Sequence, residues 1–199
     1  MEEPIVRLRI ELEGTSPVIW REVDVPLMSS LKAISTVIIE AMGWLGYHLH
    51  EFDVAGKRYG VPSPAFEPFG SEVANEANIR LSAIVDRGIK QFQYVYDFGD
   101  DWLHTVSIGE VRAGAPEIEY PAYVSGEYQC PPEDVGGIYG FYEFLEAIED
   151  PAHERHEELL EWHGGLFDPK EVPETQIRLA LKEIAKRRRG GARKGRVSK

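Results

Sequence analysis

Two histidines, His48 and His50, lie two residues apart in a segment with the alternation of a β-strand. Because successive side chains of a strand point to opposite faces, both imidazoles should project from one face, an arrangement that suits two ligands of one metal ion. The alternative is that both are structural residues, hydrogen-bonded beside Phe52 at the rim of the core. The spacing fixes no third ligand, so both readings stay open.

Three aspartates crowd one predicted hairpin turn: Asp97, Asp100 and Asp101. Carboxylates this close repel one another, and a divalent cation or an arginine would relieve that repulsion. Aspartate is also the expected residue in a tight turn, because its side chain bonds nearby backbone amides. Turn geometry explains Asp97 least. His104 follows on the second strand of the hairpin.

Glu133 and Asp134 come after the stiff segment Cys130-Pro131-Pro132 and just before a predicted helix. Carboxylates are favourable near the positive end of a helix, so capping is their simplest role, and acid–base chemistry is the alternative. Cys130 is expected to be a small buried side chain rather than a nucleophile.

A divalent metal ion held by some of these residues is one hypothesis, and the sequence leaves open whether any cofactor is present. The candidate metal ligands are His48, His50, Asp97 and His104. The candidate catalytic residues are Asp97, Asp101, His104, Glu133 and Asp134. The pair His153 and His156 lacks the His-Glu-x-x-His order of zinc proteases, and no Gly-rich phosphate loop or nucleophile elbow occurs.

The strands and helices that the sequence predicts around these residues indicate an α+β fold. Residues 5–12 and 18–25 read as paired strands, residues 31–42 as a helix, and residues 48–54 as a third strand. A central hairpin follows over residues 92–108, and helices are expected over residues 138–149 and 152–163 and from Pro173 onward. Strands first and helices last favour one domain over residues 1–185, with the C-terminal helices packed on a mixed or antiparallel sheet. The Pro- and Gly-rich stretch 60–78 is either a lid or disordered, and we favour disorder.

The charge is divided unevenly along the 199 residues. Residues 1–185 hold 14 Lys and Arg against 34 Asp and Glu, a net charge of −20, whereas residues 186–199 carry +8. We expect residues 186–199 to be a disordered basic tail, solvated or folded back on the acidic body. Nucleic-acid binding by this tail is the alternative, because the acidic body would repel a phosphate backbone. Its candidate contacts are Arg187, Arg188, Arg189, Arg193, Lys194 and Arg196.

The composition also predicts where the protein resides. No apolar run approaches the roughly 20 residues of a membrane helix, and the N-terminus lacks a signal pattern, so no membrane partner is expected. The single Cys130 fits a reducing compartment. We expect a cytoplasmic location.

A series of motifs resembles the plasmid pRiA4b ORF-3-like family, whose members occur near plasmids and insertion elements. The matching stretches, in family order, are Pro17-Val18-Ile19-Trp20-Arg21, Met42-Gly43-Trp44, His48-Leu49-His50-Glu51-Phe52, Tyr96-Asp97-Phe98-Gly99-Asp100-Asp101-Trp102, Cys130-Pro131-Pro132-Glu133-Asp134, and Asp150-Pro151 with Trp162. The chain departs from the family pattern at Ser35, Ile39 and Val135, where the family commonly has His, Gln and a second Cys. The missing second cysteine counts against a two-cysteine metal or redox site.

The resemblance implies an α+β fold and a link to mobile elements. The first functional hypothesis is therefore an accessory binding or interaction module associated with plasmids or transposable elements, with an unknown protein or nucleic-acid partner. The second is a metal-binding protein or metal-dependent hydrolase of phosphoesters, built on the His, Asp and Glu motifs. The third is nucleic-acid binding through the tail. Whether the protein is an enzyme stays open.

Overall fold

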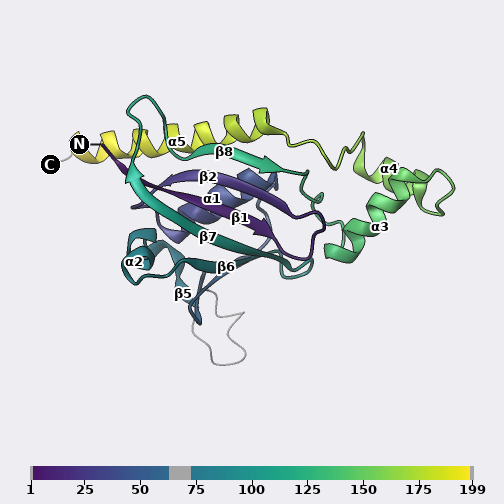
Figure 1. The fold of residues 1–199 in the computed structure, drawn as a ribbon, viewed down its shortest axis with the longest axis horizontal. Coiled ribbons are helices and arrows are strands. Elements are labelled where there is room, and N and C mark those ends of the chain that lie inside the picture. The colour runs from purple at the N-terminus through teal and green to yellow at the C-terminus, as the bar shows by residue number, and fades with distance from the viewer. Residues whose placement is uncertain (1, 63–72, 198–199) are drawn as a thin grey trace.

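The computed structural model describes residues 2–62 and 73–197, with side chains described as far as residue 190. Its described strands form one sheet in the order β5-β4-β3-β6-β7-β1-β2-β8 (Figure 1). The strands are β1 (Pro4–Leu12), β2 (Ile19–Pro26), β3 (His50–Val54), β4 (Lys57–Gly60), β5 (Ala74–Asn75), β6 (Gln91–Tyr96), β7 (Trp102–Ala113) and β8 (Ala122–Glu127). Every pairing is antiparallel except the short one between β4 and β5. The expected α+β class with a mixed sheet is confirmed.

The helices take three positions around this sheet (Figure 1). They are α1 (Leu31–Met42), the 3₁₀ turn η2 (Glu76–Asn78), α2 (Leu81–Asp86), α3 (Gly137–Glu149), α4 (His156–His163) and α5 (Glu174–Val197). Helix α1 lies across one face, and α5 runs along β8. Helices α3 and α4 project past one end of the sheet.

Alternation along the strands divides the sheet into a buried and a polar face. In β1, Leu8 and Ile10 are fully buried, whereas the alternating residues Arg7 and Arg9 are partly exposed. The apolar face packs against Ile34 and other buried residues of α1 in a single core. Ser30 caps the start of α1 by accepting a hydrogen bond from the backbone N–H of Ala33.

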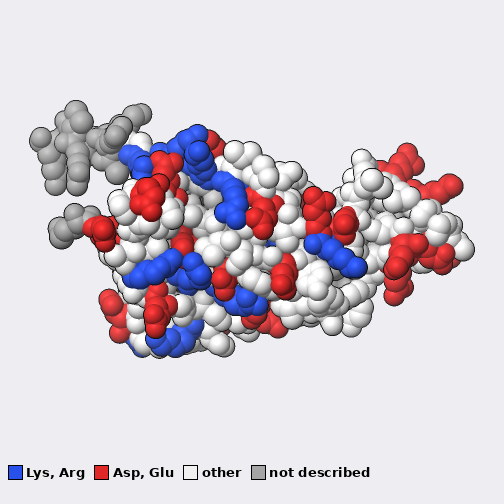
Figure 2. All heavy atoms as spheres, turned by 45° about the horizontal axis from the view of Figure 1, so that its top comes forward, with Lys and Arg blue, Asp and Glu red and all other residues white. Residues whose placement is uncertain are grey.

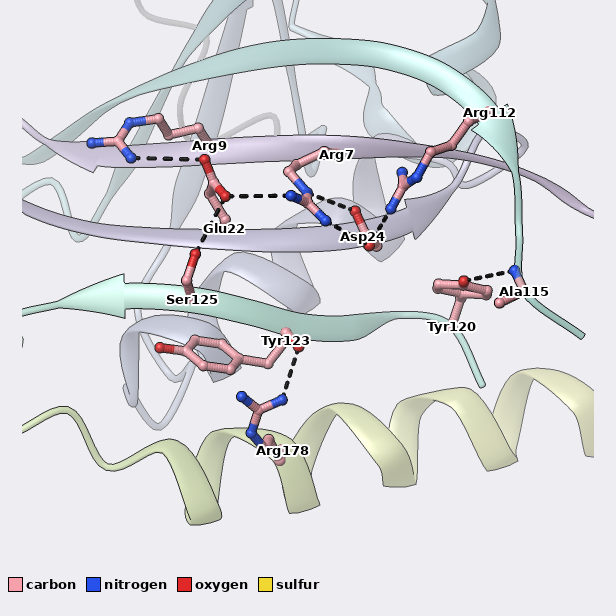
Figure 3. A network of polar contacts seen from close by, with 10 residues as sticks. All are labelled: Arg7, Arg9, Glu22, Asp24, Arg112, Ala115, Tyr120, Tyr123, Ser125 and Arg178. Atoms are coloured by element: carbon pink, nitrogen blue, oxygen red, sulfur yellow. Dashed lines mark hydrogen bonds and ion pairs between the residues drawn. The ribbon is translucent and has the colours of Figure 1, made fainter. Parts of the chain in front are cut away.

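The polar face carries a charged network centred on Asp24 (Figure 3). Arg7 Nε donates to Asp24 Oδ1 at 3.0 Å, and Arg112 Nη2 donates to Asp24 Oδ2 at 2.5 Å. Burial acts to raise the pKa of Asp24, but the hydrogen bonds from Arg7 and Arg112 outweigh it and hold this pKa below its usual value. The network links β1, β2 and β7 on the side of the sheet away from α1.

Two expectations about irregular segments need correction. The stretch 60–78 was expected to be one disordered or lid-like loop, but β4 reaches Gly60 and the segment from Ala74 to Asn78 forms β5 and η2. Residues 63–72 of that prediction lie outside the described residues.

The tail is the second correction, because α5 continues as a helix to Val197 where residues 186–199 were expected to be disordered. Lys and Arg are good helix formers, and buried Ile177 and Leu181 fix the first part of α5 on the core. Arg188 then pairs with Glu3 at 2.5 Å, and Arg189 pairs with Glu119 at 2.5 Å. The tail thus begins by lying against acids of its own domain.

Within residues 2–62 and 73–197, no helix combines the length and the apolar character needed to cross a membrane.

Candidate metal centre

Three loops meet at the end of the sheet from which α3 and α4 project. They are the segment 43–49 after α1, the turn 97–101 between β6 and β7, and the segment 130–136 before α3. Trp44 ties them together: it is buried, stacks on Tyr96 with ring centroids 5.1 Å apart, and donates from Nε1 to the carbonyl of Pro131 at 3.0 Å. Gly43 makes this route available, because it ends α1 in the left-handed conformation at φ 90°.

Asp97 is held in place by its backbone and by its own turn. Its N–H donates to the carbonyl of Leu49 at 2.8 Å, and its carbonyl accepts from the N–H of Asp101 at 2.7 Å. Its φ is +57°, a left-handed conformation that Asp adopts more readily than most residues. Asp97 Oδ1 accepts a hydrogen bond from Gly99 N at 2.9 Å, which leaves Oδ2 for another partner.

Glu133 and Asp134 are oriented in the same way: in each carboxylate, one oxygen accepts hydrogen bonds from neighbouring residues. Glu133 Oε1 accepts from Leu45 N at 2.7 Å and from the Tyr96 hydroxyl at 2.9 Å. Asp134 Oδ2 accepts from the Tyr47 hydroxyl at 3.1 Å. Burial, followed by the bond to Glu133, raises the pKa of Tyr96, so this hydroxyl keeps its proton and acts as a donor.

The three remaining carboxylate oxygens converge on one nitrogen, His48 Nε2. Asp134 Oδ1 lies 3.0 Å from it, Asp97 Oδ2 lies 3.6 Å from it, and Glu133 Oε2 lies 3.8 Å from it. Ligand atoms of His48, Asp97 and Asp134 all fall within 4.8 Å of one another. Each carboxylate therefore turns one oxygen toward His48 Nε2, and His48, Asp97 and Asp134 form the group whose ligand atoms are all close to one another, with Glu133 beside it.

Two atoms at this point are buried and unsatisfied. Among the described residues, neither His48 Nε2 nor Glu133 Oε2 makes a hydrogen bond, even though His48 Nε2 is close to Asp134. The Glu133 side chain is only 10% exposed. A buried polar atom without a partner costs about 1–3 kcal/mol, so a group that binds one nitrogen and several oxygens would stabilise this point.

A divalent metal ion has the required size and chemistry. With ligand bonds of about 2.1 Å, neighbouring ligand atoms are about 3.4 Å apart in a tetrahedral site and about 3.0 Å apart in an octahedral one. The separations of 3.0, 3.6 and 3.8 Å from His48 Nε2 bracket these values. The hydrogen bonds to the outer oxygens resemble the outer shell that orients metal ligands. The Asp134 side chain is 56% exposed, so solvent reaches the cluster on that side.

The structure brings together only part of the predicted site. His48, Asp97, Glu133 and Asp134 meet, as described. His50 lies elsewhere, with Nε2 2.8 Å from Glu76 Oε2, and Asp101 is an exposed turn residue. β3 begins at His50, but both imidazoles lie on the same side of β6, with His48 beside Tyr96 and His50 beside Tyr94. The two rings have different polar partners, so their sharing of one metal ion stays a prediction.

His104 also lies apart from the cluster. It is fully buried, its Nδ1 contacts the carbonyl of Tyr94 at 3.2 Å, and burial lowers its pKa to about 4. A neutral imidazole packed edge-on to Trp44 is part of the core.

The orienting residues Tyr47 and Tyr96 were not predicted from the sequence. The alternation of β6 marks Tyr96 as a core residue, and it is buried, but a periodicity does not show where its hydroxyl points. Cys130 is buried as expected, with Sγ 3.3 Å from Arg21 Nη2. Burial raises the pKa of its thiol.

The model of the plasmid pRiA4b ORF-3-like proteins matches residues 4–176, nearly the whole of the described domain. The chain belongs to this family. His48 and the three acids around its Nε2 all lie within the matched range. The family resemblance seen in the motifs is thereby confirmed.

Two other proteins are similar to this chain over most of their length. The chain is 39% identical over 187 residues to a protein of Sinorhizobium fredii (strain NBRC 101917 / NGR234) named "Uncharacterized protein y4hQ", covering 93% of this chain and 94% of that one. It also resembles the crystal structure of "Protein of Unknown Function MM3350" from Methanosarcina mazei Go1, with a TM-score of 0.80 and 30% identity over 88% of this chain and 97% of that chain. Neither relative's name states an activity, so function rests on the geometry.

Proposed function

We propose that this protein binds one divalent metal ion through His48, Asp97, Glu133 and Asp134. The proposal rests on the different contacts made by the two oxygens of each carboxylate. One oxygen is held by a neighbouring donor, and the other points at His48 Nε2. Acidic side chains that merely share a surface have no reason to adopt this arrangement, because their free oxygens repel one another.

The donor set favours a first-row transition metal. An imidazole nitrogen suits zinc, iron or manganese better than magnesium or calcium, which prefer oxygen ligands alone. Three carboxylate oxygens in addition favour manganese, iron or zinc over copper(I), which prefers sulfur.

Binding is better supported than hydrolysis. Three carboxylates carry a formal charge of −3, so a divalent ion with a neutral imidazole leaves the centre at −1. A centre of that charge is a weak Lewis acid and repels a phosphate group. Hydrolysis of phosphoesters, the second hypothesis from the sequence, stays a prediction with less support than metal binding.

The position of the ion gives it a role in the architecture. Its ligands come from three segments far apart in the chain, and Glu133 and Asp134 stand directly before α3. An ion at this point would fasten α3 and α4 to the sheet. That role fits the binding or interaction module implied by the family, whose link with mobile elements stays a prediction.

Nucleic-acid binding by the tail has weaker support. Arg188 and Arg189 already pair with acids of the domain, which reduces the charge available to phosphates.

Isothermal titration of Zn²⁺ and Mn²⁺ into chelator-treated protein tests the proposal. We expect saturable binding of one ion per chain that is lost in His48→Ala and kept in His153→Ala, a histidine whose Nδ1 only accepts a local bond from Arg155 N. Equal binding by both variants, or none by the native chain, would contradict it.

A further inference from the structure

Helices α3 and α4 form an acidic lobe, defined here as residues 137–163. It projects from the end of the sheet opposite to the end of α5 (Figure 1). The lobe contains eight Asp and Glu residues and one basic residue, Arg155, for a net charge of −7. Acidic side chains are spread over the projecting lobe, whereas basic side chains lie over the rest of this face, mixed with acidic ones (Figure 2).

Most of this negative charge is unpaired within the described structure. Arg155 pairs with Glu143 at 2.7 Å and with Glu158 at 2.7 Å, so the lobe's one cation is already used. The other exposed glutamates form no ion pair with a described residue; they are Glu146, Glu149, Glu154, Glu157 and Glu161.

The lobe also exposes large apolar side chains. Tyr139 is 91% exposed, Trp162 is 45% exposed, and Leu166, just beyond the lobe, is 99% exposed. Aromatic side chains within a charged rim are typical of surfaces that bind another polypeptide.

The sequence contains one segment of complementary charge, residues 186–199, at +8. Lys186, Arg188 and Arg189 pair with acids of their own chain, and the other five basic residues of the segment carry +5. Helix α5 has 24 residues and is therefore about 36 Å long, and it runs away from the lobe of its own chain. A tail on this helix does not reach its own lobe. In an antiparallel pair with two-fold symmetry, however, each tail lies beside the lobe of the other copy, and the assembly closes.

We propose that this protein forms such a homodimer, in which the acidic lobe of each copy binds the basic segment 186–199 of the other. The acidic lobe at one end and the basic segment at the other favour this antiparallel pairing over parallel pairing, which would juxtapose like charges. The proposal does not depend on the metal centre.

Sedimentation velocity over a range of protein concentrations tests the proposal. We expect a dimer at about 10 mM salt that dissociates at about 1 M, because the Debye length falls from about 30 Å to about 3 Å. The lobe variant Glu146→Gln/Glu154→Gln/Glu161→Gln and the tail variant Arg193→Gln/Lys194→Gln/Arg196→Gln should each weaken the dimer about tenfold. The tail variant leaves the Arg188 and Arg189 pairs intact.

A matched control separates pairing of these two regions from a general effect of charge. The variant Asp86→Asn/Glu110→Gln/Glu117→Gln removes three exposed acids outside the lobe and should leave the dimer unchanged. Combining the lobe and tail variants should weaken it little more than either alone, because both remove the same contacts. A monomer at low salt, or additive effects in the combined variant, would overturn the proposal.

Discussion

The hydroxyl of Tyr96 donates a hydrogen bond of 2.9 Å to Glu133 Oε1 and so leaves Glu133 Oε2 facing His48 Nε2. Tyr96 comes from the middle of the sheet and Glu133 from the segment before α3, so one bond joins the core to the candidate metal centre. Buried stacking of Tyr96 against Trp44 fixes the ring that carries this hydroxyl. The core thus determines which oxygen of Glu133 is available to a metal ion.

Tyr96→Phe should weaken metal binding by about tenfold to a hundredfold, as expected when an outer-shell donor is removed. The Leu45 N–H still reaches Glu133 Oε1, so some orientation remains. Tyr94→Phe is the matched control: it removes a buried tyrosine hydroxyl of the same strand, 2.9 Å from Ser35 Oγ, without touching the centre. Calorimetric titration of both variants checks this, and equal losses would argue against an orienting role for Tyr96.

His48 and His50 should respond differently to replacement. His48→Ala should abolish metal binding with little effect on the fold, since its Nε2 makes no hydrogen bond with the described residues. His50→Ala should keep metal binding and lower the free energy of unfolding by about 1–3 kcal/mol, because it leaves buried Glu76 without its imidazole partner. Titration with Zn²⁺ and urea denaturation measure the two effects. Loss of binding in both variants would restore the shared site that the sequence spacing suggests.

Asp134→Asn should make the free energy of unfolding much less dependent on added metal. Without metal, removing one of three converging carboxylate charges should raise the free energy of unfolding by about 0.5 kcal/mol. Asn also tolerates the left-handed backbone at this position, where φ is +58°. The native protein should gain about 2.7 kcal/mol at a metal concentration of 100 times Kd, and the variant much less. Thermal unfolding with and without Mn²⁺ measures both; a variant that is less stable without metal would show that the carboxylates are not in repulsion.

The buried imidazole of His104 should make the protein less stable in acid. Its pKa is lowered to about 4 in the folded chain, from 6.5 when unfolded. Above pH 6.5 both states are neutral; below it only the unfolded state binds the proton, so stability falls as the pH drops toward 4. The loss from this residue between pH 6.5 and 5 is about 2 kcal/mol. In His104→Phe the decline measured by urea denaturation should be smaller by that amount, and an unchanged decline would contradict this assignment.

The sequence was sufficient to predict the helices and strands. It was not sufficient to predict which of the candidate site residues lie together in space. Alternation in residues 92–98 and 102–108 predicted the β6–β7 hairpin, because a strand with one buried face must show that period. The same period placed His48 and His50 on one face, and their rings do pack against Tyr96 and Tyr94 of that face. The period could not show that Glu76 pairs with His50 while Asp97 and Asp134 lie beside His48.

Contacts between residues far apart in the sequence account for the features that the sequence did not predict. Leu45 N and Tyr47 reach Glu133 and Asp134 across 88 and 87 residues of sequence, and no local pattern encodes such contacts. Only the family motifs pointed to both segments, without showing that they meet. The helical tail was missed for a similar reason, since its pairs with Glu3 and Glu119 connect distant parts of the chain.

The most direct measurement is anomalous diffraction from crystals of this protein soaked with Mn²⁺. The account predicts one strong anomalous peak at about 2.1 Å from His48 Nε2, with oxygens of Asp97, Glu133 and Asp134 around it and none beside His50 or His104. An ion bound only elsewhere, or no peak among these four residues in crystals soaked to saturation, would contradict the central claim.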